Sequence, residues 1–220
     1  KRFHPWVFSG AIAEVQGSPA EGDIVSVHAS DGDFLAYGHY QIGSIAVRVL
    51  SFDESALHPA FWEDMLARAL EVRVACGLHG SADTNCYRLV HGEGDNLPGL
   101  IIDYYDGVCV LQAHSVGMFR AKKQICDALR VVYGPELKAV YDKSSGTAPF
   151  KAGLELIDGY LYRREDFHKN ELAVLENGQK FLVNWTEGQK TGFFLDQRDN
   201  RALVGSVARG RNVLNLFCYT

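Results

Sequence analysis

The last apolar run of the chain, residues 212–218, places the tightest constraint on the fold. Its sequence, Asn-Val-Leu-Asn-Leu-Phe-Cys, is short and almost continuously apolar, which is typical of a strand buried in a parallel sheet. Such a strand needs a neighbour on each edge, because a lone one leaves backbone groups unpaired and apolar faces exposed. We therefore expect an α/β domain to begin near this run and the chain to be truncated at Thr220.

Residues 1–67 are predicted to form a small β-rich module. Turns that contain glycine, proline or aspartate separate short apolar or alternating runs at 7–12, 23–28, 34–40 and 45–50. Strands so short and so evenly spaced favour a small barrel over an open α/β sheet. A helical pattern of apolar residues follows His58 and Pro59 and extends to about residue 77.

Residues 68–175 alternate between strand and helix patterns, and this alternation predicts a central α/β domain. The expected helix is amphipathic and covers residues 118–133. The expected strands cover residues 86–91, 99–103, 108–113 and 139–143. The turn between the first two contains His91, Glu93 and Asp95, whose side chains are compatible with a metal. No second ligand cluster accompanies them, so a structural turn is favoured.

A third domain, residues 176–220, is predicted to start at a β-hairpin. Asn177 and Gly178 form the strongest short-range signal for a hairpin turn, here between the runs 172–176 and 179–184. A helix is expected from about residue 196 to residue 208. The predicted fold class is therefore α+β and α/β, divided over several domains.

Charge and cysteine content exclude several classes of function. The formal net charge is -5, which argues against affinity for nucleic acid driven by bulk charge alone but does not exclude a local basic patch. No apolar run is long enough to span a membrane, and no membrane partner is expected. The five cysteines include no C-x-x-C pair, which argues against a disulfide framework and a zinc site. We expect no metal, a reducing cytoplasm, and burial of the first four thiols.

Three motifs carry a resemblance to a known family. They are His4-Pro5-Trp6-Val7-Phe8-Ser9-Gly10, the run from Arg88 to Leu100, and Gly188 to Arg198 followed by Asn215-Leu216-Phe217-Cys218-Tyr219-Thr220. In this order they resemble the RlmI-like (YccW-like) large-subunit ribosomal RNA cytosine-C5 methyltransferases, and the resemblance covers essentially the whole chain. It implies a PUA-like RNA-binding domain at 1–67, a central domain at 68–175, and the truncated start of a Rossmann-like methyltransferase domain at 176–220.

The resemblance implies S-adenosylmethionine as the cofactor and assigns to it Lys190, Thr191, Gly192, Phe193, Arg198, Cys218, Tyr219 and Thr220. Lys190 and Arg198 could pair with the carboxylate of the cofactor, and Asp196 could fix Arg198. Phe193 and Phe194 could cover the adenine or a flipped base. The alternative is structural, with both phenylalanines in the core and Asp196 as an N-cap. A structural role is favoured for residues 194–196, and a ligand role for Lys190, Thr191 and Phe193.

Catalysis is expected to depend on residues after Thr220. Methylation of cytosine C5 needs a cysteine thiolate that attacks C6 and a base that removes the C5 proton. The resemblance places the catalytic cysteines downstream, so no catalytic residue is assigned here and the chain alone is expected to be inactive. Cys218 is interpreted as packing beside the cofactor. Periodicity alone leaves residues 212–218 as an ordinary buried strand, and the resemblance favours a cofactor strand.

Ribosomal RNA is the partner that the resemblance implies, and the residues predicted to bind it are Arg2, His4, Trp6 and Arg48. They combine cations with one large stacking surface, a mixture used on unpaired bases and phosphates. Trp6 could equally fill the core of the small barrel. The sequence is also compatible with a homodimer. Two alternative functions remain: a stand-alone RNA-binding scaffold, and a methyltransferase that acts on a protein or a small molecule.

Overall fold

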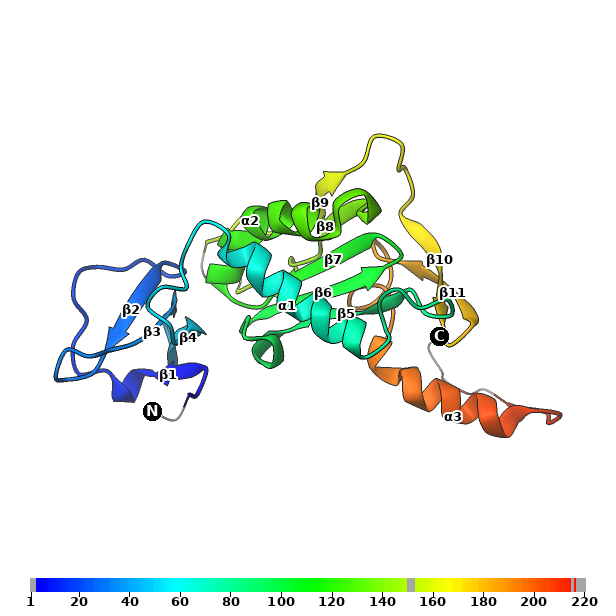
Figure 1. Cartoon of the computed structure of the whole chain (residues 1–220), viewed down its shortest axis with the longest axis horizontal. Coiled ribbons are helices and arrows are strands. Elements are labelled where there is room, and N and C mark those ends of the chain that lie inside the picture. Colours follow the sequence, from blue (N-terminus) through cyan, green and yellow to red (C-terminus); the bar gives the residue numbers. More distant parts are fainter. Residues whose placement is uncertain (1–2, 150–152, 215, 217–220) are drawn as a thin grey trace.

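The first sheet of the molecule is small and antiparallel. In the computed structural model, which describes residues 3–149, 153–214 and 216, its strands lie in the order β1-β4-β3-β2 (Figure 1). They are β1 (Trp6–Phe8), β2 (Ile24–His28), β3 (Phe34–Tyr40) and β4 (Ile45–Ser51). The first strand ends at Phe8, earlier than predicted, because the chain turns into a 3₁₀ helix, Ser9–Ala11. The Ser9 N–H donates to the Ser44 carbonyl at 2.9 Å and fixes this turn.

The second sheet forms the centre of the molecule, and α1 (Phe61–Ala75) and α2 (Val116–Tyr133) cover one of its faces (Figure 1). Its strand order is β5-β6-β7-β8-β9, in which β7 and β8 run parallel and the other neighbours antiparallel. The strands are β5 (Cys86–His91), β6 (Leu100–Tyr105), β7 (Val108–Ala113), β8 (Ala139–Asp142) and β9 (Gly159–Arg163). The sequence predicted these elements except β9, whose residues are all half-buried and show no alternation.

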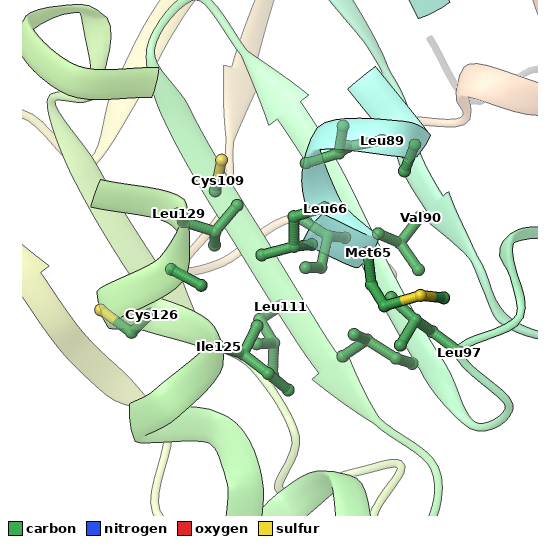
Figure 2. Packing of buried hydrophobic residues seen from close by; sticks show 14 of the residues in the cluster. Met65, Leu66, Leu89, Val90, Leu97, Cys109, Leu111, Ile125, Cys126 and Leu129 are labelled. Atoms are coloured by element: carbon green, nitrogen blue, oxygen red, sulfur yellow. The ribbon is translucent and has the colours of Figure 1, made fainter. Parts of the chain in front are cut away.

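A hydrophobic core fills the space between the two helices and the sheet (Figure 2). Met65 and Leu66 of α1 meet Ile125 and Leu129 of α2 above the strands. Side chains of a strand alternate between its two faces, so β7 contributes to this core every second residue, Cys109, Leu111 and Ala113. The period of two therefore decides which side chains of the sheet face the helices and which face away from them.

Three of the cysteines in the described residues are buried, and a fourth departs from the prediction. Burial raises the thiol pKa of Cys86 to about 12 and that of Cys126 to about 11, and it also raises the pKa of Cys109. Cys76 is exposed, because it caps the C-terminal end of α1, beyond Ala69, the last buried residue of that helix. Buried apolar thiols of this kind are inert near neutral pH.

A β-hairpin covers the opposite face of the central sheet. Strands β10 (Glu171–Glu176) and β11 (Gln179–Asn184) pair antiparallel. The predicted turn is confirmed, with φ of +50° at Asn177 and +76° at Gly178. The hairpin and the segment after it bury a second core, which includes Tyr105, Val108, Val110, Val174, Val183 and Trp185. The central sheet is thus enclosed between helices on one face and the hairpin on the other.

The last described helix, α3 (Arg198–Ala208), extends away from the central sheet (Figure 1). None of its residues is buried, and Leu203, Val204 and Val207 are 64%, 54% and 55% exposed. The strand predicted at 212–218 is not formed by the residues described there, 212–214 and 216, because they pair with no other described strand. Residues 215, 217 and 218 lie outside the described residues.

The first sheet is joined to the central one through a buried histidine. His39 on β3 is 3% exposed and stacks on Trp62 of α1, with ring centroids 6.4 Å apart. Gly117, in the first turn of α2, lies so close that a Cβ there would overlap the His39 ring. Burial lowers the pKa of His39 to about 4. The sequence-based domain boundaries at residues 67 and 175 fall inside α1 and β10.

Candidate functional site

The predicted cofactor loop, residues 188–198, lies on the hairpin side of the central sheet. It follows Trp185, which is fully buried, and leads through a 3₁₀ turn, Leu195–Gln197, into α3. Thr191 and Phe193 are 0% and 3% exposed, so their side chains point into the protein. The loop therefore has an inner side that contacts the sheet and the hairpin, and an outer side that faces solvent.

Thr191 joins the loop to strand β6 through a buried carboxylate. Its hydroxyl donates to Asp103 at 2.6 Å, and Asp103 is itself 0% exposed. Because this donation uses the only hydroxyl proton of Thr191, the Tyr105 hydroxyl donates to Thr191, at 2.8 Å. Arg88 of β5 donates twice to Asp103, at 2.8 and 3.0 Å. The hydrogen bonds to Asp103 raise the pKa of Arg88 and burial raises that of Tyr105, so both remain protonated donors.

Arg198 is tied into the protein by internal contacts. Its Nη2 donates to the Cys86 carbonyl at 2.5 Å, and its Nε lies 3.5 Å from a carboxylate oxygen of Glu176. Glu176 is 2% exposed and also accepts two hydrogen bonds from Arg201, of 2.6 and 2.7 Å. The structure thus corrects the expected pairing of Asp196 with Arg198. The carboxylate beside Arg198 is that of Glu176, because the hairpin carries it beneath the start of α3.

The outer side of the loop carries a cluster of exposed groups. The ammonium of Lys190 lies 3.6 Å from the Asp196 carboxylate and 4.3 Å from the centre of the Phe194 ring. The side chains of Lys190 and Asp196 are 49% and 52% exposed. Asp196 is not the N-cap of α3, because it lies inside the preceding 3₁₀ turn and Gln197 takes the cap position. A cation, a carboxylate and an aromatic ring together suit a ligand that is both charged and aromatic.

Two glycines let the loop pass close to the end of the hairpin. A Cβ at Gly188 would overlap the Asn184 carbonyl, and one at Gly192 would lie 2.8 Å from the same oxygen. Gly192 also has φ of +122°, which residues with a Cβ rarely adopt. On the other side, Lys143 after β8 donates to the Gly188 carbonyl at 2.5 Å. The backbone of the loop is therefore held between β11 and the segment that follows β8.

The predicted RNA-binding residues lie on and beside β1. The rings of His4 and Trp6 are 5.7 Å apart. Phe8, which was not among the predicted residues, lies 5.9 Å from His4 and 6.3 Å from Trp6 and is 48% exposed. Residues two apart on a strand share a face, so the spacing His4-x-Trp6-x-Phe8 is the signal that could have identified it. Arg2 lies outside the described residues.

Trp6 and Arg48 also hold the first sheet against the central one. The Trp6 Nε1 donates to Glu93 at 2.8 Å. The Arg48 guanidinium lies 3.6 Å from the same carboxylate and 5.8 Å from the centre of the Trp6 ring. Trp6 is half-buried, so one edge of its ring makes an internal contact. Asp95 accepts a hydrogen bond of 2.8 Å from Arg73, and the turn that contains Glu93 and Asp95 has the structural role expected from the sequence.

The other predicted cofactor residues, Cys218, Tyr219 and Thr220, lie outside the described residues. Within the described ranges, no group of three or more His, Cys, Asp or Glu side chains is arranged to hold a metal ion. Nor does any helix in this part of the chain have the length and apolar character needed to cross a membrane.

Matches to two family models cover the two ends of the chain. Residues 1–52 match a PUA-like domain, and this range contains the first sheet. Residues 164–220 match an S-adenosylmethionine-dependent methyltransferase, and this range contains the hairpin, the cofactor loop and α3. Fold and matches together define the class of protein, a PUA-like domain joined to a mixed sheet of the methyltransferase type.

Curated relatives resemble the chain along its whole length. The ribosomal RNA large subunit methyltransferase I of Pseudoalteromonas translucida is 41% identical over 222 residues, which cover 100% of this chain and 54% of the relative. That of Shewanella amazonensis is 41% identical over 225 residues, with the same two coverages of 100% and 54%. The chain is thus similar over its whole length to the relatives named ribosomal RNA large subunit methyltransferase I. It spans about half the length of the curated relatives it matches.

Solved structures share the fold. A putative S-adenosylmethionine-dependent methyltransferase from Streptococcus mutans has a TM-score of 0.73 at 22% identity, over 94% of this chain and 51% of that one. A putative methyltransferase complexed with SAH has a TM-score of 0.71 at 22% identity, over 90% and 48%. The predicted fold class is confirmed, and the methyltransferase model that matches residues 164–220 depends on S-adenosylmethionine, the cofactor that the sequence resemblance implied.

Proposed function

We propose that this chain forms the N-terminal part of a methyltransferase that acts on large-subunit ribosomal RNA. One observation carries the proposal: a PUA-like sheet with exposed aromatic residues is docked on the same central sheet that holds a loop of the methyltransferase match. The names of the relatives supply the substrate class. S-adenosylmethionine supplies the methyl group when bound. The residues of this chain bind and orient the cofactor and the RNA.

The outer side of the cofactor loop is the part that we assign to cofactor contact. The Lys190 ammonium would pair with the carboxylate of S-adenosylmethionine, and Asp196 would accept hydrogen bonds from its ribose hydroxyls. Phe194 would pack on the adenine. The inner residues of the predicted set hold the loop in place; they are Thr191, Gly192, Phe193 and Arg198. Cys218, Tyr219 and Thr220 stay predicted contacts.

The face of β1 is the surface that we assign to RNA. His4, Trp6 and Phe8 offer aromatic rings on which unpaired bases can stack, at about 1–3 kcal/mol per base. Arg48, together with Arg2, would contact phosphates. Because the net charge of the chain is -5, recognition would depend on a few such contacts and on RNA shape, with little contribution from a broad positive field.

The assignment of C5 of a cytosine as the target atom rests on the sequence resemblance alone. That chemistry needs a reactive thiolate, and burial raises the thiol pKa of Cys86, Cys109 and Cys126. As the resemblance implies, we propose that the nucleophile follows Thr220 and that the chain alone transfers no methyl group. Free cysteines fit a reducing compartment, and we propose the cytoplasm.

The experiment joins this chain to the C-terminal half of the Pseudoalteromonas relative and supplies labelled S-adenosylmethionine with unmethylated large-subunit ribosomal RNA. We expect label at C5 of a cytosine with the chimera and no label with the chain alone. Label on another atom of the RNA would refute the cytosine C5 assignment. Label on protein or on a small molecule would refute the RNA substrate. RNA binding without cofactor binding or transfer would instead favour a stand-alone RNA-binding module.

The cofactor contact has its own test in Lys190→Ala. Loss of the ammonium should weaken binding of S-adenosylhomocysteine, measured by calorimetry, by about tenfold, the factor for one charge-assisted hydrogen bond. Lys180→Ala is the matched control, because Lys180 is an exposed lysine on the neighbouring hairpin. Equal losses in both variants would indicate an effect of net charge and would remove Lys190 from the site.

A further inference from the structure

Asp103 lies far from the cofactor loop in sequence, yet it contacts the centre of that loop. Its side chain is 0% exposed. One carboxylate oxygen accepts from the Arg88 Nε at 2.8 Å, and the other accepts from the Arg88 Nη2 at 3.0 Å and from Thr191 at 2.6 Å. Hydrogen bonds to an ionised group are stronger and more directional than neutral ones. A carboxylate held by three of them inside the protein has little freedom to move.

Thr191 lies between two residues of the loop whose backbone conformations are unfavourable on their own. Its neighbours Lys190 and Gly192 both have positive φ, of +51° and +122°. Such conformations persist only where the surroundings fix them, and positive φ is unfavourable for a residue with a Cβ, such as Lys190. Within this turn, Thr191 is buried against Asp103, while Lys190 faces solvent.

We propose that Asp103 is a positioning residue for the cofactor loop, because through Thr191 it holds the turn that directs Lys190 outward. Asp103 would not touch the cofactor itself. The inference rests on the proposed function for its ligand, since the direction of Lys190 matters only if the loop binds S-adenosylmethionine. It gives the central sheet a part in cofactor binding.

Two substitutions at Thr191 test the contact in the full chain. Thr191→Val removes the hydroxyl and keeps the branched shape, whereas Thr191→Ser keeps the hydroxyl. Amide hydrogen exchange at residues 189–193 should be about tenfold faster or more in Thr191→Val, as expected for loss of one hydrogen bond to a charged group. Binding of S-adenosylhomocysteine should weaken by about the same factor. Both quantities should return close to the wild-type values in Thr191→Ser.

Asp103→Asn is a second variant that approaches the contact from the sheet. It keeps the shape of the side chain but removes the charge that Thr191 and Arg88 share. Exchange at residues 189–193 should again become faster, and by a larger factor than exchange in the β10–β11 hairpin. This difference separates a positioning role from general loss of stability, which would speed exchange equally in both segments.

The outcomes distinguish the inference from the proposed function. Wild-type exchange at residues 189–193 in a folded Thr191→Val variant would overturn the inference. A lower unfolding midpoint with equally faster exchange in loop and hairpin would also overturn it, since Asp103 would then only stabilise the sheet. If the wild-type chain binds no S-adenosylhomocysteine, its part of the proposed function fails, and the exchange measurement still decides whether Asp103 holds the loop.

Discussion

Two carboxylates join the outer parts of the molecule to the central sheet, and they differ in their access to water. Glu93 accepts from Trp6 and pairs with Arg48 at the junction with the first sheet. Asp103 has the equivalent place beneath the cofactor loop, where it accepts from Thr191. The side chain of Glu93 is 38% exposed, whereas that of Asp103 is 0% exposed.

This difference in exposure sets how strongly each contact constrains the part it holds. Water screens the charge of Glu93, so its ion pair with Arg48 contributes about 1 kcal/mol or less. Water cannot replace a lost partner of Asp103, so removal of one side of that network leaves a buried polar group unpaired. The contact at Glu93 beneath the first sheet is therefore adjustable, while the contact at Asp103 fixes the loop 188–198.

The largest effect is expected for Asp103→Ala, which removes the buried carboxylate. Arg88 loses its bidentate partner, and Thr191 loses its acceptor. Breaking a buried ion pair costs about 3–5 kcal/mol. Because the Arg88 side chain is 30% exposed and can regain water, we expect the low end of that range. Urea unfolding followed by tryptophan fluorescence measures this loss in the free energy of unfolding.

Asp106→Ala is the matched control for this prediction. Asp106 directly follows β6 and pairs with Lys138 at 2.7 Å, but its side chain is 40% exposed. The expected loss in the free energy of unfolding is about 1 kcal/mol or less. Equal losses in the free energy of unfolding at Asp103 and Asp106 would show that burial of the carboxylate does not determine how strongly its ion pair stabilises the fold.

The next effect concerns pH and His39, a buried polar group between the first sheet and α1 and α2. Burial lowers the pKa of His39 from 6.5 to about 4. Between these values the unfolded chain binds a proton that the folded chain excludes, so stability is complete above about pH 6.5 and falls as pH drops towards 4. The loss in the free energy of unfolding approaches about 3 kcal/mol. Urea unfolding at about pH 7.5 and at about pH 4.5 measures it. In His39→Gln this component should vanish, and an unchanged pH dependence would contradict the prediction.

Gly117→Ala tests how closely the first sheet is packed on α2. The added Cβ would overlap the His39 ring, which is stacked on Trp62. Overpacking of this kind costs about 1–3 kcal/mol, and limited proteolysis between residues 52 and 60 should become faster. Gly10→Ala is the control, because a Cβ there meets nothing within 4 Å. If the two variants are cleaved at the same rate, the junction is looser than the structure indicates.

The order of elements could be predicted because each rests on a local signal. The bounds of β3, β5 and β7 followed from short apolar runs, and Asn177-Gly178 located the hairpin. Strand β9 was missed, since its half-buried residues give no alternation. Local patterns thus identify strands whose residues alternate or are almost all buried, such as β7 and β8, and fail where every residue is half-buried, as in β9.

The direction of side chains in the candidate site could not be predicted, because it depends on residues distant in sequence. Thr191 is buried by Asp103, which lies 88 positions away. Trp6 is held by Glu93, at a separation of 87 positions. Residue types indicated which chemistry these segments carry, but only the tertiary contacts decide that Thr191 faces inward.

The smallest effect is expected for Glu93→Gln, which changes the more exposed carboxylate. Gln keeps an acceptor for the Trp6 Nε1 and removes the charge that faces Arg48. Because the Glu93 side chain is 38% exposed, screening limits the loss to about 0.5 kcal/mol at low salt, and less at high salt. Trp6→Phe should lower the free energy of unfolding by about 1 kcal/mol, and the double variant by less than the sum, since both changes act on one carboxylate. A loss in Glu93→Gln larger than that in Asp103→Ala would mean that the contact at Glu93 is the more rigid of the two.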